Sequence, residues 1–278
     1  MKAPIRLLAL DIDGTLLDPQ FQISSANLAA LRRAHEAGVE IVLGTGRRHA
    51  FAMPVAAELG FDVWLITSNG AVTKSSRGEL FHRDLLPATV ARKLMAHMDA
   101  FRPNVVFTFD VEGRGALVIE SAETLNGSIQ RWMEKNAEYI LTVIPIENTL
   151  STDPVQAMFC GQIARMKEAE AHLAIADFSS EFTALKTQYE ARNLCILDVL
   201  NRECSKGHAL RRWAEFRGYG REEVMAIGDN YNDLEMLEYA GIPYIMGNAS
   251  EDLKSNGFKV TLGNDASGVA AALEDVGI

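Results

Sequence analysis

Two aspartates one residue apart, Asp11 and Asp13, are the residues of this sequence best suited to chemistry. They end a short apolar run that begins at Ile5 and is typical of a buried strand. Side chains at positions i and i+2 of a strand leave the same face, so both carboxylates are expected to converge on one small volume. Because buried charges are costly unless they are compensated, the pair predicts a cation-binding site at the end of the strand.

Strand and helix patterns alternate near both ends of the chain, as in β-α-β units. After the first strand, Ser24 and Ser25 can cap a helix that stops at Gly38. Ligands of open parallel sheets bind at the carboxyl ends of the strands, so the polar clusters that follow the strands are expected to form one crevice. The further strands of this kind are predicted at 39–43, 63–66, 224–228 and 244–246.

These clusters contain the groups that phosphoryl transfer needs. Asp11 is a candidate nucleophile, and Asp13 is a candidate general acid and base. Asp229 is a third carboxylate that can hold Mg²⁺, an ion that prefers oxygen ligands. Lys206, at the start of a predicted helix, supplies a positive charge. Thr45, Gly46 and Asn232 can donate hydrogen bonds to phosphoryl oxygens. Asp233 can fix Lys206 or a metal-bound water. Arg47 and Arg48 are either substrate contacts or surface residues.

The middle of the chain has a different pattern. Two predicted strands at 105–110 and 116–119 flank a Glu-Gly-Arg-Gly turn and are typical of a hairpin. We predict an α/β fold, with a doubly wound, mostly parallel Rossmann-like core formed by 1–83 and 199–278, and an α+β domain inserted at 84–198. The insert is further predicted to contain helices at 122–136 and 162–175 and strands at 139–144, 155–159, 182–188 and 194–200.

Composition narrows the function classes. The 278 residues carry a formal net charge of −10, which argues against nucleic acid and anionic membranes as partners. The three cysteines are widely spaced and form no CxxC motif, so neither a disulfide framework nor a zinc site is expected. A strand that begins within five residues of the N-terminus leaves no room for a signal peptide, and no run reaches 18 apolar residues. We expect a cytoplasmic protein, and the sequence carries no signal for its oligomeric state.

Four motifs occur in order along the chain: Asp11-Ile12-Asp13-Gly14-Thr15, Thr45-Gly46-Arg47, Ser205-Lys206-Gly207 and Gly228-Asp229-Asn230-Tyr231-Asn232-Asp233. They resemble those of the haloacid dehalogenase-like superfamily, and the long insert resembles the large α+β cap of its Cof-type branch. Two shorter stretches, Asn69-Gly70-Ala71 and Gly247-Asn248-Ala249, resemble further landmarks of that branch. The segment 264–269 departs from the acidic-Gly-Val run that is usual there.

This resemblance implies a Mg²⁺-dependent phosphatase that acts through an aspartyl-phosphate on Asp11. It also implies that Asp13 reaches the metal through its backbone carbonyl, that Ile12 contributes to phosphate binding, and that Asn230 and Asp233 support the metal site. The expected substrate is a small phosphomonoester, such as a sugar phosphate. Two alternatives stay open. A phosphotransferase or phosphomutase would move the phosphoryl group to a second sugar, and a non-catalytic sensor would bind a phosphorylated ligand without turnover.

Overall fold

The computed structural model describes residues 5–122, 125 and 129–278, and the chain divides into two compact units. Unit 1 comprises Met1–Arg83 and Ser205–Ile278, and unit 2 comprises Asp84–Cys204. The second boundary therefore falls after Cys204, whereas the sequence analysis placed it after residue 198. The reason is strand β11 (Leu194–Asn201), which pairs along its whole length with β10 (Phe182–Tyr189) and so belongs entirely to unit 2.

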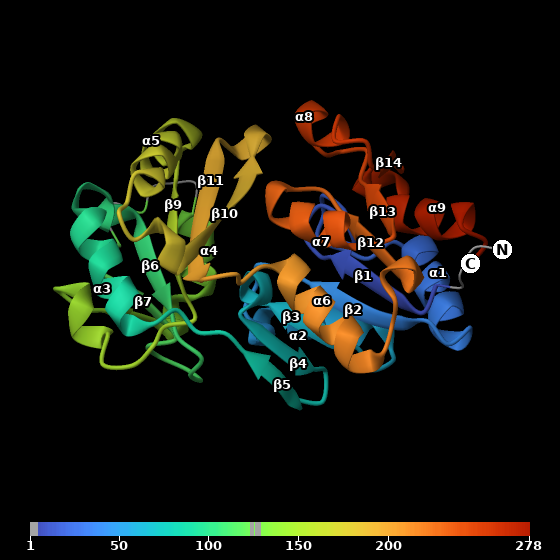
Figure 1. Cartoon of the computed structure of the whole chain (residues 1–278), viewed down its shortest axis with the longest axis horizontal. Helices are drawn as coiled ribbons and strands as arrows, with labels where there is room; N and C mark the ends of the chain where they lie inside the picture. The colour runs from blue at the N-terminus through green and yellow to red at the C-terminus, as the bar shows by residue number, and fades with distance from the viewer. Residues whose placement is uncertain (1–4, 123–124, 126–128) are drawn as a thin grey trace. The chain divides into compact units, whose positions relative to one another are not determined.

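Unit 1 is built on an eight-stranded sheet with the order β14-β13-β12-β1-β2-β3-β4-β5 (Figure 1). The strands from β14 to β3 run parallel, while β4 and β5 extend the edge in antiparallel fashion. The predicted parallel-rich core is thus confirmed. The strands are β1 (Leu7–Asp11), β2 (Glu40–Gly44), β3 (Trp64–Thr67), β4 (Val72–Ser75), β5 (Leu80–Arg83), β12 (Val224–Gly228), β13 (Ile242–Ile245) and β14 (Lys259–Val260).

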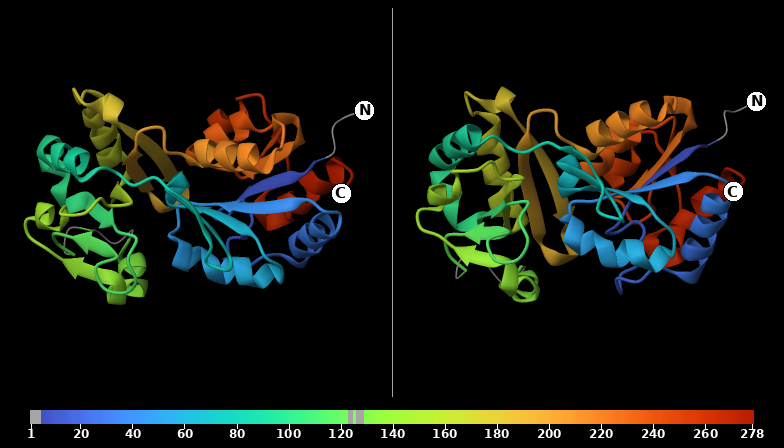
Figure 2. Two further views of the ribbon diagram at one scale, coloured as in Figure 1. Left: turned by 60° about the horizontal axis from the view of Figure 1, so that its bottom comes forward. Right: turned by 90° about the horizontal axis from the view of Figure 1, so that it is seen from below.

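Helices cover both faces of this sheet (Figure 2). Alternate side chains of β1 serve the two faces: Leu8 and Leu10 pack toward one set of helices, and Leu7 and Ala9 pack toward the other. The fold is therefore doubly wound. The first set is α1 (Ser25–Glu36), α2 (His49–Leu59) and α9 (Gly268–Asp275), and the second is α6 (Lys206–Arg217), α7 (Leu234–Tyr239) and α8 (Glu251–Lys254).

The connections of the sheet diverge at β1. From β1 the chain moves to β2 and β3 on one side, and after unit 2 it enters β12 on the other side of β1. Right-handed crossovers that proceed in opposite directions place their helices on opposite faces, which explains the double winding. The carboxyl ends of β1 and β12 flank the point of divergence, where open α/β sheets bind ligands. Asp11 and Asp229 stand at these two strand ends.

Unit 2 contains a six-stranded sheet with the order β10-β11-β9-β6-β7-β8, antiparallel except for the parallel pair β7 and β8. Its strands β6 (Val105–Thr108), β7 (Leu117–Ile119), β8 (Ile140–Thr142) and β9 (Gln156–Gly161) include the expected hairpin of β6 and β7. Helices α3 (Ala88–His97) and α5 (Ile163–Ala174) pack on one face, and α4 (Gln130–Lys135) packs on the other. Of the helix expected at 122–136, residues 123–124 and 126–128 lie outside the described residues.

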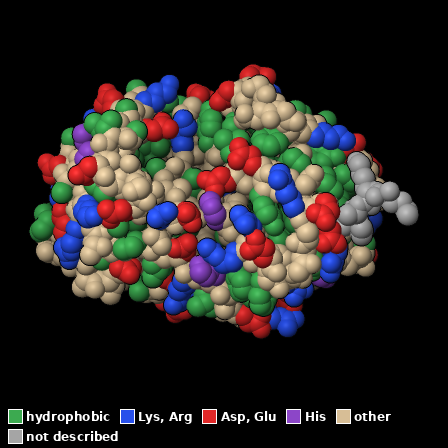
Figure 3. Space-filling model, viewed as in Figure 1, with side chains coloured by type: hydrophobic (Ala, Val, Ile, Leu, Met, Phe, Trp, Pro, Cys, Tyr) green, Lys and Arg blue, Asp and Glu red, His purple; other side chains and the backbone are tan. Residues whose placement is uncertain are grey.

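In the described part of the chain, no helix combines the length and the apolar character needed to cross a lipid bilayer. Figure 3 shows one face of the surface, on which acidic and basic side chains are interspersed. The chemistry-bearing motifs lie in unit 1: three follow the carboxyl ends of its parallel strands, and Ser205-Lys206-Gly207 begins α6.

Candidate active site

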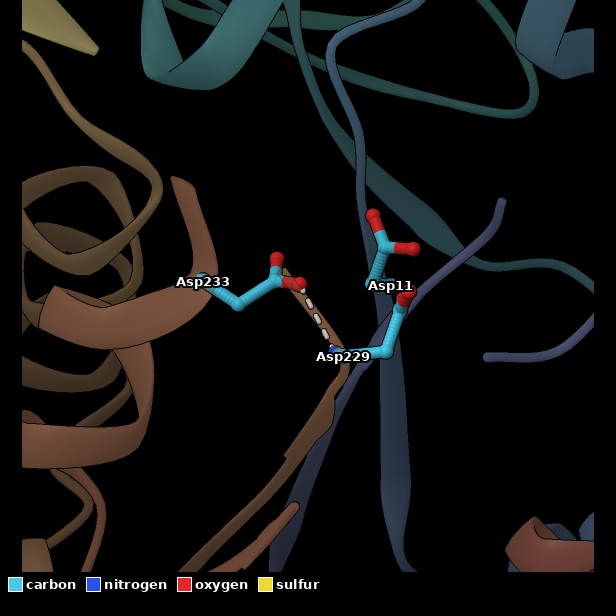
Figure 4. A group of neighbouring side chains, drawn as sticks. All are labelled: Asp11, Asp229 and Asp233. Carbon is cyan, nitrogen blue, oxygen red and sulfur yellow. Dashed lines mark hydrogen bonds between the residues drawn. The ribbon is translucent and has the colours of Figure 1, made fainter. Parts of the chain in front are cut away.

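Three carboxylates converge where β1 and β12 end. Asp11 is the last residue of β1, Asp229 follows β12, and Asp233 lies in the turn before α7. One oxygen from each carboxylate lies within 4.8 Å of the others, as Figure 4 illustrates. All three residues are buried, with exposed fractions of 5%, 8% and 0%. The sequence analysis expected the carboxylates of Asp11 and Asp13 to converge. The observed group instead joins Asp11 to two aspartates that follow β12, because β1 ends at Asp11 and the Asp13 carboxylate pairs with Arg47.

Lys206 lies between two of these carboxylates. Its ammonium nitrogen Nζ donates to Asp11 Oδ1 and to Asp233 Oδ1, each at 2.6 Å, and the side chain is fully buried. The lysine is the first residue of α6, whose N-terminal cap is Ser205: the Ser205 hydroxyl accepts a hydrogen bond from His208 N at 3.1 Å. Because α6 packs against one face of the sheet, its first residue, Lys206, approaches the ends of β1 and β12 from that face.

Burial dominates the electrostatics of this cluster. It raises the pKa of Asp11 to about 7, against the opposing pull of Lys206 and with the help of the charge of Asp233. Burial also raises the pKa of Asp229 well above its usual range, and the charges of Asp11 and Asp233 add to the effect. For Lys206, burial lowers the pKa, but the two carboxylates more than offset this and raise it overall. Three carboxylates therefore share one ammonium. Full ionisation of the group would leave negative charge uncompensated, and the raised pKa values of Asp11 and Asp229 reflect that cost.

Hydrogen bonds fix two further carboxylate oxygens of the group. Asp233 Oδ2 accepts from the backbone N–H groups of Asp229 and Asn230, both at 3.0 Å. The Thr15 hydroxyl donates to Asp229 Oδ1 at 2.8 Å. Gly14, at a φ of +90°, passes so close that a Cβ there would lie 2.4 Å from Asp229 Oδ2. A side chain at this position would displace Asp229, so the glycine is required by the close approach of the two loops.

The candidate phosphate-binding residues Thr45 and Asn232 lie in loops that follow different strands. Thr45 is buried after β2, and its hydroxyl accepts a hydrogen bond from Arg47 N at 3.1 Å. Asn232 follows β12, and its amide Nδ2 donates to Asn69 Oδ1 at 2.8 Å. The side chain of Ile12 is part of the hydrophobic core, so only its backbone is available to a ligand.

The two arginines after β2 differ in their surroundings. Arg47 forms a two-pronged ion pair with Asp13, with Nε to Oδ2 at 2.7 Å and Nη2 to Oδ1 at 2.5 Å. The Arg48 guanidinium lies over the ring of Phe51, 5.5 Å from its centroid. Arg47 is therefore connected to the site through Asp13, whereas the guanidinium of Arg48 packs on Phe51.

Residues that the sequence analysis did not assign to the site brace the loop after β1. Asn248 Nδ2 donates to Gly14 O at 2.9 Å, and Asn264 Nδ2 donates to Leu17 O at 2.7 Å. Asn264 N in turn donates to Asn248 Oδ1 at 2.9 Å. Asn248 follows β13, so its place at a strand end was a usable signal. No comparable signal marked Asn264. It belongs to the segment 264–269 that departs from the usual family pattern, and this segment thus contacts the loop next to Asp11.

A family profile described as haloacid dehalogenase-like hydrolase matches residues 8–273. The chain belongs to the haloacid dehalogenase-like hydrolases. This confirms the family that the four motifs indicated, and the match spans nearly the whole chain of this hydrolase.

Similar proteins of known name include phosphatases. The hydrolase is 32% identical to phosphatase YwpJ of Bacillus subtilis (strain 168) over 282 residues, which cover 96% of this chain and 98% of that protein. It is 31% identical to the HMP-PP phosphatase of Escherichia coli (strain K12 / DH10B), over 90% of this chain and 87% of the other. Among solved structures, BT1666 from Bacteroides thetaiotaomicron matches with a TM-score of 0.80 and 27% identity, over 99% and 96% of the two chains. These similarities support a phosphatase enzyme.

The shared ammonium predicts a large effect of Lys206→Met on stability. Removal of one partner from a buried ion pair leaves an uncompensated charge, so we expect the free energy of unfolding to fall by about 3–5 kcal/mol. Chemical denaturation measures this loss. The matched double variant Lys206→Met/Asp233→Asn removes one of the stranded charges, while the amide oxygen can still accept the two backbone N–H groups, so it should recover part of the loss. A double variant that is no more stable than Lys206→Met would contradict this account of the cluster.

Proposed function

We propose that this hydrolase is a Mg²⁺-dependent phosphatase that hydrolyses small phosphorylated metabolites through an aspartyl-phosphate on Asp11. The observation that carries the proposal is the buried group of Asp11, Asp229 and Asp233 around the single ammonium of Lys206. When fully ionised, such a group has more negative charge than Lys206 compensates, and it stands at a strand end where ligands bind.

The donor set fits a magnesium ion. Asp11 and Asp229 offer carboxylate oxygens, and we assign the backbone carbonyl of Asp13 as a third ligand. Asp233 is committed to Lys206 and to two backbone N–H groups, so we assign it a supporting role together with Asn230. When bound, Mg²⁺ would neutralise the charge of the phosphoryl oxygens that approach Asp11.

Asp11 is held in a position for attack on phosphorus. Lys206 fixes its Oδ1, and we assign the other oxygen, Oδ2, as the nucleophile. A bond forms between Oδ2 and phosphorus, the phosphate-ester bond breaks, and Asp13 donates a proton to the leaving oxygen. Asp13 then takes a proton from water, which attacks the phosphorus, releases inorganic phosphate and restores Asp11. Arg47 donates to both oxygens of Asp13, so one of these bonds must open for the carboxyl to hold the proton that it transfers.

The oxygens of the substrate's phosphoryl group are bound by neutral donors and one cation. We assign the Thr45 hydroxyl, the Gly46 N–H, the Asn232 amide and the Lys206 ammonium to this role, with the backbone of Ile12. We propose Arg48 as a contact to the rest of the substrate. Related proteins are named for phosphatase activity, one of them for HMP-PP, which supports a small phosphorylated compound as substrate. We propose sugar phosphates or similar metabolites, and phosphate release rather than transfer to a second sugar.

Activity should depend on magnesium. We expect phosphate release from a panel of phosphorylated metabolites to stop on chelation and to return with Mg²⁺, but to return poorly with Ca²⁺. Calcium forms longer bonds and accepts more ligands, so it can engage both oxygens of Asp11 and remove the nucleophile. Release of inorganic phosphate measures each condition. Undiminished turnover in excess chelator would exclude a metal from the mechanism. Full activity with Ca²⁺ would contradict only the argument that calcium engages both oxygens of Asp11.

The two chemical steps should separate in Asp13→Asn. An aryl phosphate has a good leaving group that needs little protonation, but hydrolysis of the aspartyl-phosphate still needs an activated water. We therefore expect the variant to lose most steady-state turnover and yet to release a single-turnover burst of the aryl alcohol. Rapid mixing, with detection of phosphate on residue 11, measures the burst. The control Asp11→Asn should give neither burst nor labelled protein, and equal loss of burst and turnover in Asp13→Asn would exclude the acid and base role.

A further inference from the structure

The turn after β3 has an unusual backbone. Ser68, Asn69 and Gly70 have φ values of +48°, +53° and +110°. Left-handed conformations are disfavoured for residues with a Cβ, although asparagine tolerates them better than most. Two successive non-glycine residues in this region are held there by their surroundings, and such strain is often kept where it positions a site.

The turn binds the backbone of the loop that carries Thr45 and Gly46. Asn69 N donates to Thr45 O at 3.0 Å, and Ser68 N donates to Arg47 O at 2.8 Å. These bonds require both N–H groups of the turn to face the same loop, which the left-handed residues make possible. The turn thereby fixes the path of the backbone on both sides of Gly46.

The side chain of Asn69 reaches a second loop. It is fully buried, and its Oδ1 accepts the hydrogen bond from Asn232 Nδ2 at 2.8 Å. A Cβ placed on Gly46 would lie 3.3 Å from the same Oδ1, so the amide stands between the loops of Gly46 and Asn232. By taking one amide hydrogen of Asn232, Asn69 sets the direction of the other.

The turn also contacts the segment that carries Lys206. A Cβ placed on Gly70 would lie 2.2 Å from Ser205 O, so the turn packs directly against the backbone that begins α6. One turn of three residues thus touches three segments that follow or precede different elements: the loop after β2, the loop after β12 and the start of α6. All of these contacts lie within unit 1.

We propose that Asn69 is a positioning residue for phosphate binding, which acts by orienting the amide of Asn232 toward the phosphoryl oxygens. This inference rests on the proposed function, because Asn232 is assigned there as a phosphate donor. Asn69 touches the donors and not the reacting atoms. Its loss should therefore weaken binding of the phosphate group more than it lowers the stability of the fold.

The test is the inhibition constant of inorganic phosphate, measured with KM, kcat and the thermal unfolding midpoint. Asn69→Gly removes the amide but keeps a residue that adopts positive φ without strain. We expect the inhibition constant and KM to rise about 5- to 10-fold, as for loss of one buried hydrogen bond, with a smaller change in kcat. Ser68→Gly is the matched control, because it adds the same flexibility to the turn and leaves the amide in place; its inhibition constant should stay within about twofold of the original.

A double-mutant cycle separates orientation from general support. In the Asn232→Ala background, Asn69→Gly should have no further effect on the inhibition constant, since the amide it orients is absent. An equal effect in both backgrounds, or an unchanged inhibition constant in folded Asn69→Gly, would overturn the proposal. If Asn69→Gly does not fold, Asn69→Ser, whose hydroxyl is too short to reach Asn232, replaces it under the same criteria. Failure of the proposed function is distinct: the unaltered enzyme would then show neither phosphate release nor inhibition by phosphate.

Discussion

The structure of unit 1 depends on the burial of three carboxylates around one ammonium. Charges taken out of water are tolerated only where partners and hydrogen bonds replace the lost hydration. Lys206 supplies a positive charge in contact with Asp11 and Asp233, and Thr15 and two backbone N–H groups supply hydrogen bonds. When Asp11 and Asp229 are both ionised, these partners do not balance the negative charge, and a divalent cation would do so.

The fold brings the charges together through the ends of two neighbouring strands. β1 and β12 are adjacent and parallel although more than 200 residues separate them, because the sheet is wound outward from β1 in both directions. Close approach then depends on glycine. A Cβ on Gly228 would lie 2.5 Å from the Cβ of Asp233, and one on Gly207 would lie 2.5 Å from the backbone of Glu235. These two glycines allow the turn after β12 to fold back and α6 to lie against it, which brings Asp233 and Lys206 into contact.

Much of this arrangement could be predicted, because strand ends and strand order are local or topological properties. Short apolar runs between helical stretches indicated β1, β2, β3, β12 and β13. The parallel pairing of these strands brings Asp11, Asp229 and Asp233 to one edge of the sheet. The hairpin of β4 and β5 was not predicted, since β4 is short and mostly polar in sequence and β5 is short and partly exposed. Contacts such as Asn69 with Asn232, or Asn264 with Leu17, could not be predicted from the sequence either, because only tertiary packing brings these side chains within reach. The chemical roles of these residues remain predictions.

The effect of Mg²⁺ on stability tests the central claim, that the buried carboxylates bind a divalent cation, without reference to any substrate. A ligand that binds only the folded state raises stability with the logarithm of its concentration once it exceeds the dissociation constant. The account predicts that the thermal unfolding midpoint of the intact chain rises steadily with Mg²⁺, and that Asp229→Asn, which keeps the size of the side chain but removes its charge, abolishes the rise. A midpoint that does not respond to Mg²⁺, or that responds equally in Asp229→Asn, would contradict it.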